Sequence, residues 1–165
     1  MTEVRLARLD DAEGINAVYN PFILKSPATF ETEPISEASR RDWLAGLGAD
    51  PRHPVVVAIG EGGKILGFAN AARFDPRAAY GTSVKTSVFV SPQASGQGVG
   101  HMLYADLFER LAQCDLHRAY GLIVAPNPAS VRLHEAFGFS HVSTLDEVGR
   151  KFDRYYSVMW FEKRL

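Results

Sequence analysis

Cysteine is almost missing from this sequence, because Cys114 is the only one. A single cysteine excludes an intramolecular disulfide and any metal site built from several thiolates, and we expect no bound metal. A nucleophilic Cys114 would need a nearby activating base, which the sequence does not indicate. We interpret it as a thiol in or beside a helix.

Long apolar segments are lacking too. The longest aliphatic run, residues 55–59, is far shorter than the stretch of about 20 residues that spans a bilayer. The first residues, MTEVR, show no apolar segment of a signal peptide. We therefore expect a cytoplasmic protein with no membrane partner.

Positive charge is not concentrated anywhere in the chain, whose formal net charge is −1. The nearest approach to a basic cluster is the pair Arg40 and Arg41, which we interpret as part of a solvated helix face. Binding to a phosphate backbone needs clustered positive charge, so we exclude nucleic acid as a partner.

Internal repeats and low-complexity linkers are absent, and 165 residues of ordinary composition fit one globular domain, residues 1–165. Hydrophobic periodicity predicts strands and helices in alternation. The predicted strands are residues 4–8, 55–59, 65–74, 82–90, 119–124, 139–148 and 155–161. This order predicts an α/β fold with a mixed, mostly antiparallel central sheet of about six or seven strands and helices on both faces.

The helix ends are predicted from capping residues. Asp10, with Glu13 three residues later, indicates an N-cap with its capping-box partner. Pro21 is expected to kink or end this first helix, because proline cannot donate the backbone bond. Ser36 is expected to cap the second helix, and a helix over residues 128–137 follows the strand 119–124.

A glycine-rich turn carries the strongest signal. Residues 91–101, SPQASGQGVGH, follow a predicted strand and open an amphipathic helix. Glycine permits positive φ and close approach to a ligand, and the unpaired N–H groups of a helix start suit a pyrophosphate. The turn lacks the Lys-Ser/Thr pair of a P-loop, and its GxGxG spacing differs from the GxGxxG of dinucleotide sites. A purely structural turn is the alternative.

Residues 124–139, VAPNPASVRLHEAFGF, give this turn its context. Further segments are ATFE at 28–31, RAAY at 77–80, SVFV at 87–90 and EVGRKF at 147–152. With these segments the chain resembles the GNAT superfamily of N-acetyltransferases and, within it, the phosphinothricin acetyltransferase-like branch. The resemblance runs nearly from end to end, and the segments together are highly specific.

The resemblance implies that acetyl-CoA is the cosubstrate, with its pantetheine arm on residues 88–90, where the sheet splays from the strand 119–124, and its pyrophosphate on the glycine-rich turn. The implied cofactor-binding residues are Val88, Phe89, Val90, Ser95, Gly96, Gln97, Gly98, Val99, Gly100, His101, Asn127 and Ser130. Ser95 stands where arginine or glutamine is usual, which predicts weaker binding. Asn127 is also an ideal N-cap before Pro128, and both roles can hold at once.

Catalysis needs a neutral amine, an oxyanion stabiliser and a proton for the departing sulfur. A free strand N–H near Phe89 or Val90 can meet the oxyanion. His134 lies two helical turns beyond Asn127 and so shares its face. Many relatives carry a tyrosine there as the acid, and a histidine can serve as one. The alternative is a half-buried structural histidine.

Lys85 breaks the pattern of the branch, because a glutamate is usual at this strand position. Three interpretations stay open. Lys85 is neutral through desolvation and acts as the base, or it binds an anionic group of the substrate while Glu31, Glu33 or Asp75 recruits the proton-accepting water. In the third, catalysis is impaired, which leaves an acetyl-CoA-binding module or an enzyme limited to amines of low pKa.

The resemblance also implies the substrate. Arg77 and Tyr80 match the substrate-binding Arg-x-x-Tyr, and a guanidinium suits a carboxylate or phosphinate. Phe30, Glu31 and Thr32 are expected in the loop wall of the pocket. The implied substrate is a small amino-acid-like amine with an acidic tail: phosphinothricin, methionine sulfoximine or methionine sulfone. An acetyltransferase for protein N-termini or lysines is the competing class, and a homodimer is expected.

Overall fold

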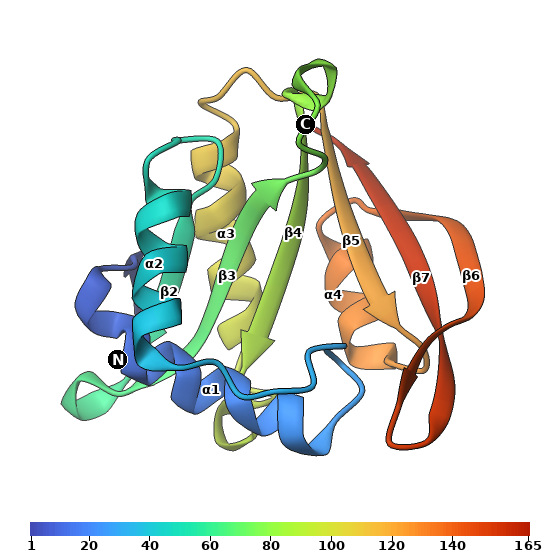
Figure 1. The fold of residues 1–165 in the computed structure, drawn as a ribbon. Coiled ribbons are helices and arrows are strands. Elements are labelled where there is room, and N and C mark those ends of the chain that lie inside the picture. Colours follow the sequence, from blue (N-terminus) through green and yellow to red (C-terminus); the bar gives the residue numbers. More distant parts are fainter.

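The computed structural model describes residues 1–165, and seven strands form one sheet in the order β1-β2-β3-β4-β5-β7-β6 (Figure 1). The strands are β1 (Glu3–Leu6), β2 (Val55–Ile59), β3 (Ile65–Arg73), β4 (Ser83–Val90), β5 (Arg118–Val124), β6 (Ser140–Lys151) and β7 (Arg154–Arg164). The helices are α1 (Ala12–Lys25), α2 (Glu37–Gly48), α3 (Val99–Leu111) and α4 (Pro128–Ala136). Only β4 and β5 pair in parallel. The predicted mixed, mostly antiparallel sheet is confirmed.

Two hydrophobic cores hold the helices against the sheet. Helices α1 and α2 lie in front of β2 and β3 in Figure 1, and α3 lies behind them. Alternation along β4 serves both cores, because Val84 packs toward α3 and Phe89 toward α1. The helix that follows the glycine-rich turn is amphipathic as predicted, because α3 buries an apolar stripe from Val99 to Leu111. None of the helices combines the length and apolarity needed to cross a membrane.

Predictions about the first helices need correction. Asp10 is not the N-cap, because its carboxylate reaches Arg41 (3.3 Å) instead. A 3₁₀ turn precedes α1, and in it the carboxylate of Asp11 accepts from the backbone N–H of Arg8 (2.7 Å). Pro21 does not end α1, which continues to Lys25. Ser36 caps α2 as expected, since its hydroxyl accepts from the N–H of Ser39 (3.1 Å).

The two halves of the sheet separate between β4 and β5. Their pairing covers only Ser83–Thr86 opposite Arg118–Gly121, and beyond this point the strands diverge into the V seen in Figure 1. Residues 87–90 keep their pairing with β3 on one side and face open space on the other. The splay that the resemblance implied is therefore present.

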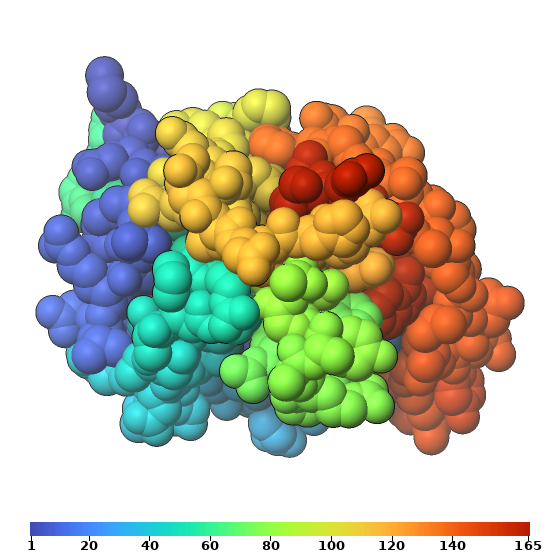
Figure 2. All heavy atoms as spheres, turned by 90° about the horizontal axis from the view of Figure 1, so that it is seen from above, coloured from blue at the N-terminus to red at the C-terminus, as the bar shows by residue number.

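The opposite end of the V is closed. There the α2–β2 loop, the β3–β4 connection and the end of α3 crowd together, as Figure 2 shows from above. Arg52 donates to the carbonyl oxygen of Gly81 (3.0 Å), and the N–H of His117 donates to Thr82 (2.8 Å). The bond from His117 joins the two halves of the sheet at this end, whereas the halves separate at the other end.

Candidate active site

A cleft of about 430 Å³ lies where β4 and β5 diverge, bordered by the glycine-rich turn and α4. It collects nearly all the predicted cofactor residues: Val88, Phe89, Val90, Ser95, Gly96, Gly98, Val99, Gly100, His101, Asn127 and Ser130. Gln97 does not border it, because its side-chain amide turns back to the carbonyl oxygen of Gln93 (2.9 Å). Segments far apart in the sequence thus meet at one elongated cavity.

The turn before α3 depends on two glycines. Gly96 and Gly98 have φ of 75° and 78°, a conformation that side chains other than glycine rarely adopt. Gly98 is the N-cap of α3, and no side chain caps this helix. The first N–H groups of α3 lack intrahelical acceptors, and they stand at the positive end of the helix dipole. Val99 buries its side chain in the core, so only its backbone is offered to a ligand.

Asn127 has the structural role that its sequence context predicted. Its Oδ1 accepts from the N–H of Ser130 (3.1 Å), and Pro128 follows in the first turn of α4. The side-chain nitrogen of Asn127 has no protein acceptor and the residue borders the cleft. The same side chain can therefore cap α4 and donate to a ligand.

His134 is buried against the floor of the cleft and is only 3% exposed. Its Nδ1 lies 2.8 Å from the carbonyl oxygen of Ser130, so Nδ1 carries the proton, and its Nε2 accepts from the hydroxyl of Tyr104 (3.0 Å). Burial lowers the pKa of His134 and raises that of Tyr104. The ring packs directly over Gly121, where a Cβ would stand 2.5 Å from Nε2.

This geometry bears on what His134 can do. A lowered pKa keeps the ring neutral, so His134 carries no imidazolium proton to donate, and its one N–H is held by the carbonyl oxygen of Ser130. Tyr104, which the sequence analysis did not single out, is completely buried and carries the proton bound to Nε2. Its place in the buried stripe of α3 was visible in the sequence, but its contact with α4 was not. Delivery of a proton to the leaving sulfur by His134 stays a prediction.

The loop that carries Phe30 and Glu31 is held from β6. Lys151 is 6% exposed, and its Nζ donates to the carbonyl oxygens of Ser26 (2.7 Å) and Thr29 (2.8 Å). The ring of Phe30 packs on Gly149, where any Cβ would collide with it. The segment EVGRKF thus positions the loop that precedes α2.

The predicted substrate residues Arg77 and Tyr80 lie on the β3–β4 connection. The side chain of Arg77 is 74% exposed and holds Asp75 through Nε (2.8 Å) and Nη2 (3.1 Å). These bonds and nearby Lys85 lower the pKa of Asp75, which weakens it as a base. Arg77 also lies over the ring of Tyr80, 5.2 Å from its centroid. Arg77 is therefore already paired, and neither it nor Tyr80 borders the cleft.

A smaller cavity of about 350 Å³ adjoins the cleft on the α1–α2 side, and Ser87 and Phe89 border both. Glu31 lies on its wall, and so does Arg40. The expectation of a solvated Arg40 is wrong, because Arg40 is only 5% exposed. The spacing from Arg40 to Leu44 and Leu47 places it on the buried stripe of α2, a signal that its charge obscured.

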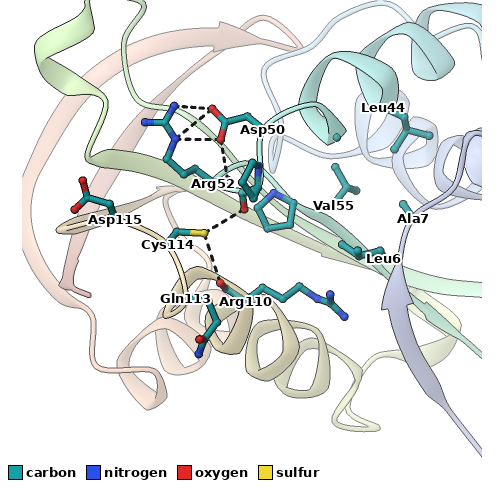
Figure 3. A pocket seen from close by; sticks show the side chains of 13 residues that line it. Leu6, Ala7, Leu44, Asp50, Arg52, Val55, Arg110, Gln113, Cys114 and Asp115 are labelled. Carbon is teal, nitrogen blue, oxygen red and sulfur yellow. Dashed lines mark hydrogen bonds and ion pairs between the residues drawn. The ribbon is translucent and has the colours of Figure 1, made fainter.

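A further hollow lies at the closed end of the sheet (Figure 3) and shares no residue with the cleft. Cys114 borders it, and its thiol contacts only the backbone carbonyl oxygens of Pro51 (3.4 Å) and Arg110 (3.7 Å). Helix α3 separates Cys114 from the glycine-rich turn by about 20 Å at 1.5 Å per residue. The interpretation of Cys114 as a thiol without an activating base agrees with these contacts.

Comparison with known proteins agrees with this geometry. The sequence pattern of the acetyltransferase (GNAT) family matches residues 16–139. The chain is 46% identical over 164 residues to the phosphinothricin N-acetyltransferase of Streptomyces coelicolor, covering 99% of this chain and 96% of that protein. It is 30% identical to the L-methionine sulfoximine/L-methionine sulfone acetyltransferase of Pseudomonas paraeruginosa, covering 98% and 94%.

A solved structure matches equally well. The GNAT superfamily phosphinothricin acetyltransferase of Sinorhizobium meliloti, in complex with acetyl-CoA, superposes with a TM-score of 0.94 at 30% identity and covers 99% of this chain and 88% of that one. The chain belongs to the acetyltransferase (GNAT) family, and it is an acetyl-CoA-dependent N-acetyltransferase.

Proposed function

We propose that this enzyme transfers the acetyl group of acetyl-CoA to the primary amine of a small amino-acid-like substrate with an acidic tail, of the phosphinothricin or methionine sulfone type. The observation that carries the proposal is the unpaired edge of β4, residues 87–90, facing a cleft that ends at the glycine-rich turn. The names of the relatives support the substrate class.

The residues of the cleft fit acetyl-CoA in chemistry. The free backbone groups of β4 suit the amides of a pantetheine arm, as a ligand that adds to a sheet edge. The N–H groups at the start of α3 suit a pyrophosphate, and Asn127 offers a free amide donor. Acetyl-CoA supplies the acetyl thioester. Ser95 leaves this end of the cleft without the longer arginine or glutamine side chain that the resemblance implies at this position.

The reaction joins the amine nitrogen to the acetyl carbon and breaks the bond from carbon to sulfur. The nitrogen loses a proton and the sulfur gains one, so the proton count balances. The N–H of Val90, on the edge of β4 that faces the cleft, stabilises the oxyanion, whereas the N–H of Phe89 faces β3. Glu31 accepts the amine proton through water. His134, which borders the cleft and is hydrogen-bonded to the buried Tyr104, supplies the proton on the sulfur side.

Lys85 keeps one alternative open, an acetyl-CoA-binding module with impaired catalysis. The closed end of the V and the small cavity, about 350 Å³, beside Glu31 favour a small substrate over a protein terminus. We also propose that the enzyme works in the cytoplasm as a homodimer, for which exposed Leu145, Val148 and Tyr155 provide apolar contact area.

The test is release of CoA thiol from acetyl-CoA with phosphinothricin, methionine sulfoximine and methionine sulfone, against a sample without amine. Amine-dependent release is expected with at least one of them. Acetyl-CoA that binds without any such release would contradict the enzymatic proposal and favour the binding module.

A variant pair tests the cofactor cleft separately. Ser95→Arg is expected to tighten acetyl-CoA binding about tenfold, as one charged hydrogen bond to a phosphate would. Gln113→Arg adds the same charge at the far end of α3 and should change nothing. Equal effects of the two substitutions would show that net charge, and not the turn, governs binding.

A further inference from the structure

Arg40 is a buried cation without an anion. Its Nε donates to Oδ1 of Asn16 (2.9 Å), whereas Nη2 is buried with no hydrogen-bond partner. No carboxylate forms an ion pair with it. By contrast its neighbour Arg41 pairs with both Glu37 (3.0 Å) and Asp10 (3.3 Å) on the surface.

Burial of this kind is costly. The guanidinium lies over the rings of Trp43 (4.6 Å to the centroid) and Tyr19 (5.0 Å), which compensate part of the lost hydration. Burial nevertheless lowers the pKa of Arg40. A buried guanidinium reaches favourable energy when its planar donors are shared with a carboxylate. A bound anion would supply the carboxylate partner that the protein itself does not provide for Arg40.

The cavity in front of Arg40 has the charges of an amino-acid site. Arg40 and Glu31 both border it without pairing with each other, so one positive and one negative group face the same space. Asn70 and Ser87 add polar side chains, and Ser87 also borders the acetyl-CoA cleft. In an α-amino acid, the carboxylate and the amine are separated by one carbon.

We propose that Arg40 binds the α-carboxylate of the substrate and that Glu31, across the cavity, faces its amino group beside the cleft. This inference rests on the proposed function and deepens it, because it makes the enzyme selective for α-amino acids over simple amines. It moves the carboxylate site from Arg77, which is exposed and held by Asp75, to a residue on α2.

The test compares methionine sulfone with its decarboxylated analogue, 3-(methylsulfonyl)propylamine. In Arg40→Met, kcat/KM for methionine sulfone is expected to fall about 100-fold, mainly through KM, as for a buried charged contact that loses one partner. The analogue should be acetylated by wild type and variant within about twofold of each other. Arg41→Met, the surface neighbour, is the matched control and should leave both substrates unaffected.

Binding is measured as well, so that the result does not depend on turnover. Calorimetric titration of methionine sulfone in the presence of CoA should show the same loss of affinity in Arg40→Met, even if no amine supports acetyl transfer and the proposed function fails. Arg40→Lys keeps the charge without the planar donors and should lose about tenfold, which covers the case in which Arg40→Met does not fold. Unchanged affinity, or equal losses on both substrates, would overturn the proposal.

Discussion

Lys151 offers a direct test of how the substrate loop is held in place. Its side chain enters from β6, and its Nζ donates to the carbonyl oxygens of Ser26 and Thr29, with that of Phe22 at 3.4 Å. These carbonyls belong to the end of α1 and to the loop that leads into Phe30. Lys151→Met removes the ammonium and keeps an unbranched stem of similar length.

The expected cost follows from these contacts. Hydrogen bonds that involve a charged group contribute roughly 1.5–3 kcal/mol each, and two of the three bonds here are short. Burial of the ammonium opposes them, as the lowered pKa of Lys151 shows, and the Met variant escapes that penalty. We therefore expect a net loss of about 3 kcal/mol in the free energy of unfolding. In a chain of this size, the melting temperature would fall by roughly 6–12 °C.

Urea unfolding at equilibrium measures this loss as a lower midpoint with an unchanged m-value. The freed loop should also raise KM for the amine substrate while leaving the affinity for acetyl-CoA unchanged. Lys64→Met, in the exposed β2–β3 turn, is the matched control. A Lys151→Met protein with wild-type midpoint and wild-type KM would refute the argument, because the three carbonyls would then be satisfied without the ammonium.

Three other predictions concern the cleft. Burial lowers the pKa of His134, so as the pH falls below the usual 6.5 the unfolded chain binds a proton there before the folded chain does. The contribution of His134 to stability is therefore full above that pH and declines below it by at most about 1.4 kcal/mol per pH unit. Urea titrations of His134→Gln should show a shallower decline. Gly121→Ala should displace the His134 ring, lower stability by about 1–3 kcal/mol and reduce kcat; an unchanged midpoint and kcat would contradict this packing. Lys85→Glu should raise kcat less than about threefold if Glu31 handles the proton, whereas a tenfold gain in steady-state assays would indicate a lost base.

Regular elements with a clear period were predictable from the sequence. The alternation of β4 and the stripe of α3 each repeat often enough to fix the buried face, and β4 begins within one residue of its predicted start. The start of α1 was not predictable in this way, because Asp10 and Asp11 are both suitable N-cap residues. The choice depends on Arg5, which binds Asp11 (2.7 Å) from β1, a contact that no local pattern encodes.

The site was predictable where backbone geometry defines it and less so where side chains do. The glycine-rich turn is visible in the sequence because its backbone conformation requires glycines. Nearly all its predicted residues border the cleft. Arg40 was missed because a charged residue is normally assigned to solvent. Its burial depends on aromatic rings from α1 and β3 as well as its own helix.

The short parallel ladder between β4 and β5 has a mechanical consequence. Only four residue pairs join β4 to β5, and so connect the two antiparallel halves of the sheet. By contrast, seven pairs join β3 to β4 and seven join β5 to β7. The seam between β4 and β5 is therefore weaker than the seams on either side of it, and amide exchange should be faster there than along them. A ligand bound along β4 contacts both halves of the sheet and stabilises the folded state. The free energy of unfolding therefore rises with the concentration of the enzyme's own cosubstrate.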